Sequence, residues 1–386
     1  MIDRPGHRQR VETLLRQFPV VAILGPRQVG KTTLAGRVVA ARRRDVTTFD
    51  LENAEDLTLL RDPLLALRPL RGLVVIDEVQ RRPELFQTLR VLVDEPRVRR
   101  RFLVLGSASP ELLRQTSESL AGRIAYHELG GFALEETGAA RWERLWRRGG
   151  FPRSFLARSD AASERWRREL IRNYLERDLP ALGLRLPAPT LRRFWMMLAH
   201  YHAQVWNASE IARSFGVAHT TVQRYLDVLT ETFMIRQLQP WHENLGKRQV
   251  KAPRLFVRDS GVLHALLGAT SVRELETHPK VGASWEGFGL ESVIARLRAE
   301  PEECFFWATH SGAELDLLVV RGRRRLGFEF KRSTTPALTR SMHVASEDLR
   351  LTKLWVVHAG ERAFDLAPRI RALPLARLLE ELQRLG

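Results

Sequence analysis

The segment from residue 19 to residue 39 constrains the fold of this chain more than any other. Residues 20–24 are apolar and rich in β-branched side chains, which is typical of a buried strand. The pattern G-x-x-x-x-G-K-T follows at 25–32, and residues 33–39 have the apolar spacing of a helix. A strand, this glycine-rich loop and a helix form the P-loop, whose backbone N–H groups cradle a phosphate. The sequence therefore predicts an α/β fold with a nucleotide site after this strand.

Each residue type in the loop has a chemical reason. Glycine at positions 25 and 30 lets the backbone wrap a phosphate without obstruction by a side chain. Lys31 can reach the β- and γ-phosphates of ATP, and the hydroxyl of Thr32 can ligate Mg²⁺. The residues expected to bind the nucleotide are Gly25, Pro26, Arg27, Gln28, Val29, Gly30, Lys31, Thr32 and Thr33.

A second apolar segment, at residues 73–76, has the pattern of a buried strand and ends in Asp77 and Glu78. Such a strand end delivers a carboxylate beside the P-loop, where Asp77 would bind Mg²⁺ directly or through water. Glu78 would then act as the general base that polarises the attacking water. An acidic pair at a strand end is otherwise often a solvated terminus, and the preceding P-loop favours the catalytic interpretation.

Two further positions complete the expected nucleotide site. A third strand at 102–105 is followed by Ser107, which either senses the γ-phosphate or belongs to a simple turn. Arg123 comes shortly after, where ring-forming ATPases often place an arginine that contacts the nucleotide of a neighbouring subunit. Only six of the 62 basic residues are lysines, so 56 are arginines, and an ordinary surface role for Arg123 stays an open alternative.

Five segments together resemble one known family. Gly-Pro-Arg-Gln-Val-Gly-Lys-Thr-Thr at 25–33, Asp-Glu-Val-Gln at 77–80 and Leu-Ala-Gly-Arg at 120–123 are similar to motifs of a prokaryotic group of AAA-type ATPases. Gly-Gly-Phe-Pro at 149–152 and Asn-Tyr-Leu-Glu-Arg-Asp at 173–178 fit the same group. The resemblance covers nearly the whole chain and implies an ATP-binding core. Members of the group also carry a carboxy-terminal domain of unknown function, so the resemblance says little about biological purpose.

Residues 206–239 have the pattern of a helix-turn-helix. Asn207 caps one helix, Gly216 makes the turn, and a second helix runs from 219 to 229. Polar side chains on the exposed face of this second helix are of types that bind phosphates and base edges. The residues expected to contact DNA are Thr220, Thr221, Gln223 and Arg224.

Strands at 234–238 and 254–257 would add a wing to this helix pair. The wing would be bridged by basic residues, namely Lys247, Arg248 and Lys251. Because many ATPases use a winged helix purely for packing, DNA contact and packing remain alternatives. The helical segment before it, at 136–200, contains tryptophans among arginines, which favours a packed lid over a surface that stacks bases.

The last third of the chain contains a second candidate site. Glu286 lies in a predicted helix, Asp316 in a predicted strand at 314–320, and Glu329 and Lys331 on one face of the next strand. This order resembles the PD-(D/E)XK nucleases, in which the carboxylates bind Mg²⁺ and the lysine orients or activates a water molecule. Such domains can also be retained as binding modules, and Lys331 could instead form an ion pair with Glu286 or Asp316.

These patterns predict four parts. They are an AAA-type P-loop ATPase core at 1–135, a helical lid at 136–200, a winged helix-turn-helix at 201–255 and an α/β restriction-endonuclease-like domain at 256–386.

Composition limits the class of protein and its partners. A net charge of +17 and a pI near 11.1 favour phosphate-rich partners such as DNA, although an arginine excess can also reflect genomic base composition. The single cysteine, Cys304, cannot form an internal disulfide or a thiolate metal cage. No apolar run approaches the ~20 residues of a membrane helix, so we expect a soluble cytoplasmic protein without membrane partners.

Two functions fit these observations. The first is an ATPase that acts on DNA and carries a metal-dependent nuclease tail. The second is a nucleotide-switched regulatory or assembly protein whose carboxy-terminal domain binds without cleaving. In both cases the expected ligands are ATP and Mg²⁺, and the expected partners are DNA and further copies of the chain, in a ring or a nucleotide-dependent dimer.

Overall fold

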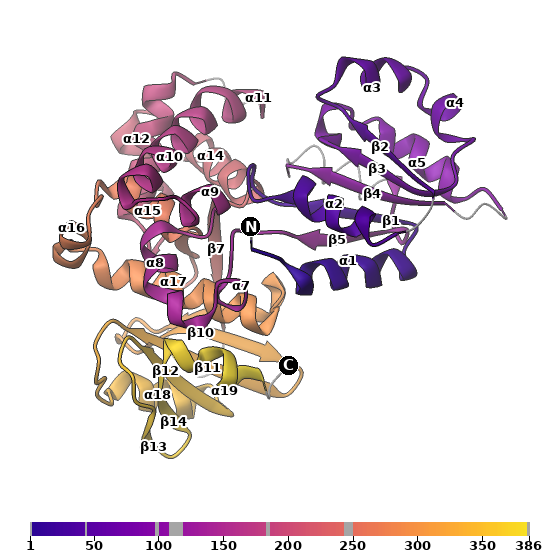
Figure 1. The fold of residues 1–386 in the computed structure, drawn as a ribbon. Coiled ribbons are helices and arrows are strands. Elements are labelled where there is room, and N and C mark those ends of the chain that lie inside the picture. Colours follow the sequence, from indigo (N-terminus) through magenta and orange to yellow (C-terminus); the bar gives the residue numbers. More distant parts are fainter. Residues whose placement is uncertain are drawn as a thin grey trace. The chain divides into compact units, whose positions relative to one another are not determined.

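The computed structural model describes residues 2–42, 45–96, 100–107, 119–182, 186–242 and 250–383. The chain forms two compact units (Figure 1). Unit 1 comprises Met1–Gly131 together with Glu231–Phe233, and unit 2 comprises Phe132–Thr230 and Met234–Gly386. The predicted end of the core at 135 lies close to this division, whereas the predicted boundaries at 200 and 255 fall inside unit 2.

Unit 1 is built on a parallel sheet in the strand order β2-β3-β4-β1-β5. The strands are β1 (Val20–Leu24), β2 (Val46–Asp50), β3 (Gly72–Asp77), β4 (Arg100–Gly106) and β5 (Ile124–Glu128). Three of them, β1, β3 and β4, lie where apolar runs predict strands, and β1 is buried along its whole length, as expected of a strand covered on both faces. Because all five run in the same direction, the carboxyl ends of β1, β3 and β4 meet at one edge of the sheet.

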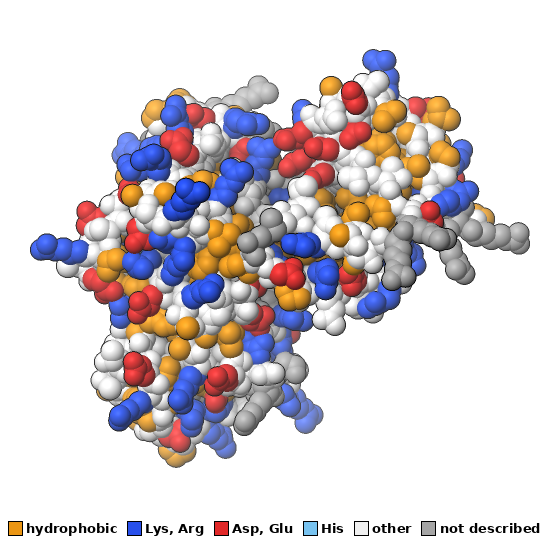
Figure 2. Space-filling view, viewed as in Figure 1, with side chains coloured by type: hydrophobic (Ala, Val, Ile, Leu, Met, Phe, Trp, Pro, Cys, Tyr) orange, Lys and Arg blue, Asp and Glu red, His pale blue; other side chains and the backbone are white. Residues whose placement is uncertain are grey.

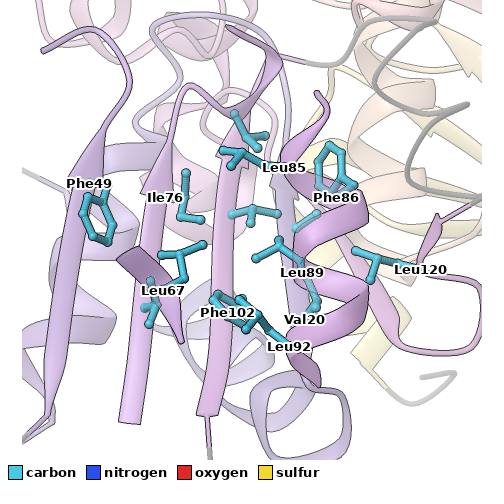
Figure 3. Packing of buried hydrophobic residues seen from close by; sticks show 14 of the residues in the cluster. Val20, Phe49, Leu67, Ile76, Leu85, Phe86, Leu89, Leu92, Phe102 and Leu120 are labelled. Carbon is cyan, nitrogen blue, oxygen red and sulfur yellow. The ribbon is translucent and has the colours of Figure 1, made fainter. Parts of the chain in front are cut away.

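Helices cover both faces of this sheet (Figure 1). One face carries α1 (Pro5–Gln17) and α2 (Lys31–Ala40), and the other carries α3 (Ala54–Leu59), α4 (Pro63–Leu67) and α5 (Leu85–Val93). Figure 3 shows Leu85 and Leu89 of α5 packed with Val20, Ile76 and Phe102 of the strands. This buried cluster fixes the strand ends from which the nucleotide-site residues project.

Unit 2 begins with a helical part, as the sequence predicts. Its helices up to α17 are α7 (Leu134–Thr137), α8 (Trp142–Arg148), α9 (Pro152–Phe155), α10 (Asp160–Asn173), α11 (Leu179–Ala181), α12 (Ala188–His200), α13 (Ala208–Phe215), α14 (His219–Glu231), α15 (Ser260–Leu267), α16 (Val272–Thr277) and α17 (Val281–Leu297), with a π-helical turn at Tyr174–Asp178. Trp146, Phe194 and Trp195 are buried among them. The aromatic residues at these positions are therefore core residues and not a base-stacking surface.

A mixed sheet completes unit 2, in the order β13-β14-β12-β11-β10-β9-β7-β8-β6. Its strands are β6 (Gln204–Val205), β7 (Ile235–Pro240), β8 (Arg254–Val257), β9 (Cys304–Ala308), β10 (Glu314–Arg321), β11 (Arg324–Lys331), β12 (Lys353–His358), β13 (Phe364–Ala367) and β14 (Ile370–Pro374), accompanied by α18 (Arg340–Asp348) and α19 (Leu378–Leu382). The sheet is continuous because β7 pairs in parallel with β9 through Gln239 and Pro240. The strands beside the helix pair and the strands of the carboxy-terminal part thus belong to one sheet.

Across the described ranges, no helix combines the length and the apolar character needed to cross a bilayer.

Candidate functional site

The loop between β1 and α2 has the backbone shape that its glycines predict. A Cβ atom on Gly25 would lie 2.1 Å from the carbonyl oxygen of Leu129, so only glycine fits at this position. Gly30 has a φ of 98° immediately before α2, and Gln28 has a φ of 64°. Left-handed backbone at a residue other than glycine costs free energy and is concentrated at functional sites. The loop leads directly into the amino-terminal end of α2, whose first N–H groups favour a phosphate.

Lys31 is a buried cation at the first position of α2. Its Nζ donates hydrogen bonds of 3.0 Å to the carbonyl oxygen of Gly25 and 2.8 Å to that of Pro26. Both acceptors belong to the loop itself, so the ammonium group lies inside the turn that would surround a phosphate. Binding of phosphate by Lys31 stays a prediction.

Thr32 and Asp77 meet at the same edge of the sheet. The hydroxyl of Thr32 donates a hydrogen bond of 2.6 Å to Oδ2 of Asp77, and Oδ1 of Asp77 accepts one of 2.8 Å from the backbone N–H of Glu78. Burial raises the pKa of the Asp77 carboxyl, while the Thr32 hydroxyl acts against this shift. A hydroxyl and a carboxylate at this spacing form a hard oxygen donor set, which fits Mg²⁺.

Glu78 is linked to the end of β4 through Gln80, a residue without an assigned role in the sequence analysis. The amide Nε2 of Gln80 donates to Oε2 of Glu78, and its Oε1 accepts a hydrogen bond of 3.2 Å from the backbone N–H of Ser107. The hydroxyl of Ser107 is buried and has no hydrogen-bond partner among the described residues. It is therefore an unused donor at the edge where the nucleotide is expected.

Other predicted loop residues have structural partners. Arg27 donates to Oε1 of Glu52 at 3.3 Å, while Thr33 is exposed on α2. The carbonyl oxygen of Val29 accepts a hydrogen bond of 3.2 Å from Arg4, whose guanidinium also reaches the carbonyls of Gly130 and Gly131. Arg4 lies 25 positions before Val29, so no local pattern could have indicated this support of the loop.

Arg123 lies at the opposite end of the sheet from the P-loop. It immediately precedes β5, and the register pairs Val20 with Ile124, at the amino ends of β1 and β5. The P-loop follows Leu24 at the other end of β1, about 15 Å away at the rise of a strand. The guanidinium forms a two-point ion pair with Asp94, at 2.7 and 2.9 Å, which holds the pKa of that carboxyl below its usual value. Arg123 therefore cannot sense the nucleotide of its own chain.

The predicted DNA-contacting residues of α14 do not all share one surface. Thr220 and Arg224 are exposed, whereas Thr221 and Gln223 are half-buried. Oε1 of Gln223 accepts a hydrogen bond of 3.0 Å from the indole of Trp206, and its Nε2 donates one of 2.9 Å to Asp227. The expectation that Gln223 lies on the exposed face is therefore wrong, because its amide joins two other side chains.

The expected wing is described in part. Strands β7 and β8 pair antiparallel, and β8 also pairs with β6. Lys251 is exposed, whereas Lys247 and Arg248 lie outside the described residues.

The four residues predicted as a nuclease-like site come together in unit 2. Nζ of Lys331 lies 3.0 Å from Oε2 of Glu329, and Oδ2 of Asp316 accepts a hydrogen bond of 3.0 Å from the backbone N–H of Phe330. Burial raises the pKa of Glu286, Asp316 and Glu329, that of Glu329 to about 8. Lys331 thus pairs with its strand neighbour Glu329, and not with either of the two acids named in the sequence-based alternative.

A residue that sequence analysis assigned only to a wing strand lies among these carboxylates. Nη1 of Arg254 is 3.5 Å from Oε1 of Glu286 and 3.5 Å from Oδ1 of Asp316, and its Nη2 contacts Glu314. Within the ranges that the structure describes, no group of three or more His, Cys, Asp or Glu residues could hold a metal ion. The carboxylates predicted to bind Mg²⁺ are thus adjacent, but they are arranged around a guanidinium.

Three family models match successive parts of this chain. Residues 17–138 match a model described as an AAA domain. Residues 139–273 and 281–378 match models described as domains of unknown function, DUF8612 and DUF4143 respectively.

Similar whole proteins include Rv2008c of Mycobacterium tuberculosis and Mb2031c of Mycobacterium bovis, both described as uncharacterized. Each is 49% identical to this chain over 379 residues, which cover 98% of this chain and 85% of the relative.

Among solved structures, a Walker-type ATPase of Pyrococcus abyssi is 17% identical with a TM-score of 0.49, over 69% of this chain and 96% of its own. A RuvB variant of Thermotoga maritima is 16% identical with a TM-score of 0.32, over 61% of this chain and 90% of its own. TM-scores below 0.5 support no argument about the fold. The family is shown by the 49% identity to the mycobacterial proteins. This chain therefore belongs to the same family as Rv2008c and Mb2031c, and residues 17–138 form its AAA-type P-loop ATPase domain.

Proposed function

We propose that this protein binds ATP together with Mg²⁺ in unit 1 and hydrolyses it to ADP and phosphate. The observation that carries the proposal is the 2.6 Å hydrogen bond between Thr32 and Asp77. Lys31 directly precedes Thr32 in the sequence, and Glu78 directly follows Asp77. Thr32 and Asp77 thus supply two oxygen donors for Mg²⁺ beside a phosphate-binding loop and a candidate base.

Different side chains of unit 1 would bind the phosphates, hold Mg²⁺ and accept the proton. Lys31 would exchange the carbonyl oxygens of Gly25 and Pro26 for phosphate oxygens, together with the N–H groups of the loop. Thr32 and Asp77 would hold Mg²⁺, which neutralises charge on the phosphate oxygens when bound. Glu78 would accept a proton from the attacking water, in the orientation set by Gln80.

Two substitutions test this proposal. Lys31→Ala should abolish tight ATP binding, measured by calorimetry, because it removes the mobile cation aimed at the phosphates. Glu78→Gln should preserve ATP binding and lower phosphate release by about 10²- to 10⁴-fold, because it removes the base but keeps the shape. Glu55→Gln on the exposed surface of α3 is the matched control and should leave both quantities unchanged. Undiminished turnover in Glu78→Gln would exclude the assigned role.

We also propose that the protein forms a homo-oligomer. The position of Arg123 supports this proposal, because Arg123 lies far from the P-loop of its own chain and is half-exposed at the other end of the sheet. Any nucleotide that Arg123 contacts must therefore belong to another copy, in a ring or a nucleotide-dependent dimer. Mixing Arg123→Ala with Glu78→Gln protein should then restore part of the turnover that each variant lacks, because a mixed interface combines the intact arginine with the intact glutamate.

We further propose that α13 and α14, with strands β6, β7 and β8, act as a winged helix that contacts DNA. The arrangement of two helices beside three antiparallel-paired strands supports this proposal, as does the exposure of Thr220 and Arg224. Figure 2 shows Lys and Arg side chains interspersed with Asp and Glu side chains over the visible face, where they do not gather into one large basic patch. We assign the proposed DNA contact to exposed side chains of α14, namely Thr220 and Arg224. The proposed setting is the cytoplasm.

For the carboxy-terminal part, the arrangement favours binding without cleavage. Arg254 neutralises part of the charge on Glu286, Asp316 and Glu314, and no metal cluster exists in the described ranges. This arrangement of residues does not fit metal-dependent cleavage of DNA. Incubation of the purified protein with supercoiled plasmid and Mg²⁺ should leave the plasmid intact, and nicking that Asp316→Asn abolishes would favour the nuclease instead.

A further inference from the structure

We infer that Arg254 is a built-in cation that neutralises Glu286 and Asp316 in the carboxylate cluster that also contains Glu329, and that it keeps divalent ions out of this cluster. The inference extends the proposal that the carboxy-terminal part binds without cleaving. It does not depend on ATP hydrolysis in unit 1.

The geometry places a fixed positive charge beside two oxygens that a shared ion would bridge. Nη1 of Arg254 is at the same distance, 3.5 Å, from Oε1 of Glu286 and from Oδ1 of Asp316. These oxygens come from α17 and β10, two elements far apart in sequence. A divalent ion bound to both, at bond lengths of about 2.0–2.6 Å, would lie beside the guanidinium and be repelled by its charge.

Arg254 is held firmly in this position. Its side chain is 9% exposed, its Nη2 contacts Glu314, and its guanidinium lies over the ring of Phe306 at 4.9 Å. Its backbone belongs to β8 and pairs with both neighbouring strands, opposite Val205 and Leu238. Because a guanidinium stays protonated in proteins, Arg254 cannot release its charge to admit another cation.

The cluster nevertheless retains capacity for an ion. Oε1 of Glu329 is buried without a hydrogen-bond partner in the described part of the chain, and the Glu329 residue is only 3% exposed. The same holds for Oε1 of Glu286, which is also buried and has no hydrogen bond to any described residue. Four carboxylates, counting Glu314, surround two cationic side chains, Arg254 and Lys331, so removing one cation leaves a strongly acidic site.

The test measures Mn²⁺ binding to the full chain by calorimetry, without nucleotide. Arg254→Gln should bind Mn²⁺ at least about 10-fold more tightly than the wild type, because a positive charge beside the ion has been removed. Arg254→Lys should show no gain, since the charge is kept. Adding Asp316→Asn to Arg254→Gln should remove the gain and so assign it to this cluster.

A matched control uses a half-buried arginine of the same sheet. Arg236 on β7 pairs at 2.6 Å with Glu291, which is not one of the cluster carboxylates, so Arg236→Gln should leave Mn²⁺ affinity unchanged. Tryptophan fluorescence of each variant shows whether unit 2 remains folded. Where Arg254→Gln is unfolded, Arg254→Met keeps an unbranched apolar chain over the ring of Phe306, removes the same charge and should give the same gain in affinity.

The outcomes separate this inference from the proposal on which it rests. Equal Mn²⁺ affinity of folded wild-type and Arg254→Gln protein would overturn the role of Arg254, whether both bind or neither does. Nicking of plasmid by the wild type, measured in parallel, would overturn binding without cleavage. A gain confined to Arg254→Gln and dependent on Asp316 would support the inference.

Discussion

At the scale of single residues, the nucleotide site depends on an unusual backbone conformation. Glu78 has a φ of 54°, in the left-handed region that costs a non-glycine residue of order 1 kcal/mol or more. Two contacts compensate for this cost, because the backbone N–H of Glu78 donates to Asp77 and its carboxylate accepts from Gln80.

Gln80 is expected to position the catalytic base. Gln80→Ala should lower kcat for ATP hydrolysis by up to about 100-fold, the cost of misplacing a reacting group by about 1 Å, and leave the affinity for ATP unchanged. Gln80→Glu should lower kcat further, because it places a like charge beside Glu78. Steady-state phosphate release and calorimetric ATP binding measure the two quantities. A fall in ATP affinity equal to the fall in kcat would contradict a positioning role.

Sequence analysis succeeds at residues whose chemistry and geometry share one local motif. The loop from Gly25 to Thr33 and the pair Asp77 and Glu78 could be identified because their neighbours dictate the backbone around them. Arg254 and Gln80 could not, since their roles depend on partners brought together by the sheet. Gln80 lies inside a segment that resembles a family motif, and that resemblance was the one signal pointing to it.

At the scale of elements, caps and turn residues predict the ends of helices well. Oδ1 of Asn207 accepts from the backbone N–H of Glu210 at the start of α13, and Gly216 has a φ of 63° at its end. The exposed face of α14 is harder to predict, because helical spacing gives the periodicity but not the neighbours. Trp206, 17 positions before Gln223, donates a hydrogen bond to that amide, and the Gln223 side chain is half-buried.

The exposed part of α14 supports a prediction on DNA binding. Arg224→Ala should weaken binding of a fluorescently labelled duplex and reduce the salt dependence of its binding constant by about one unit of slope, as for a lost phosphate contact. Fluorescence anisotropy over a series of salt concentrations measures both. Arg213→Ala, at an exposed position of α13, is the control and should leave the slope unchanged. An unchanged slope in Arg224→Ala would favour the alternative in which this helix pair only packs.

At the scale of the whole molecule, the two units can be observed separately. The chain has nine tryptophans, and the first in sequence is Trp142, so all of them lie in unit 2. Intrinsic tryptophan fluorescence therefore reports the unfolding of unit 2, and nucleotide binding reports unit 1.

This separation allows a test of a buried histidine. His202 is 1% exposed, its Nδ1 accepts from the backbone N–H of Val257, and burial lowers its pKa from 6.5 to about 3. Below about pH 6.5 the imidazole of His202 binds a proton in the unfolded chain but not in the folded unit. The contribution of neutral His202 to the stability of the folded unit is therefore fully present above that pH and is lost as the pH falls toward 3.

His202→Asn keeps an acceptor near the Val257 N–H but cannot be protonated. The difference in unfolding free energy between wild type and His202→Asn should therefore shift by about 1.4 kcal/mol per pH unit in this range, in favour of the variant at lower pH. Urea titrations followed by tryptophan fluorescence at about pH 7 and about pH 5 measure it. A difference that is independent of pH would show that His202 is protonated in the folded unit.

The pairing of β7 with β9 limits which fragments of this protein can be expressed on their own. A fragment beginning at residue 256 would lack β7 and the first half of β8, which would leave the backbone groups of β9 bare along one edge. Bare edges recruit strands from other molecules, and such a fragment would be prone to aggregation during expression. It would also lack Arg254, so that its buried carboxylates would repel one another. A fragment suited to expression on its own would therefore begin near Phe132 and include the whole of the shared sheet.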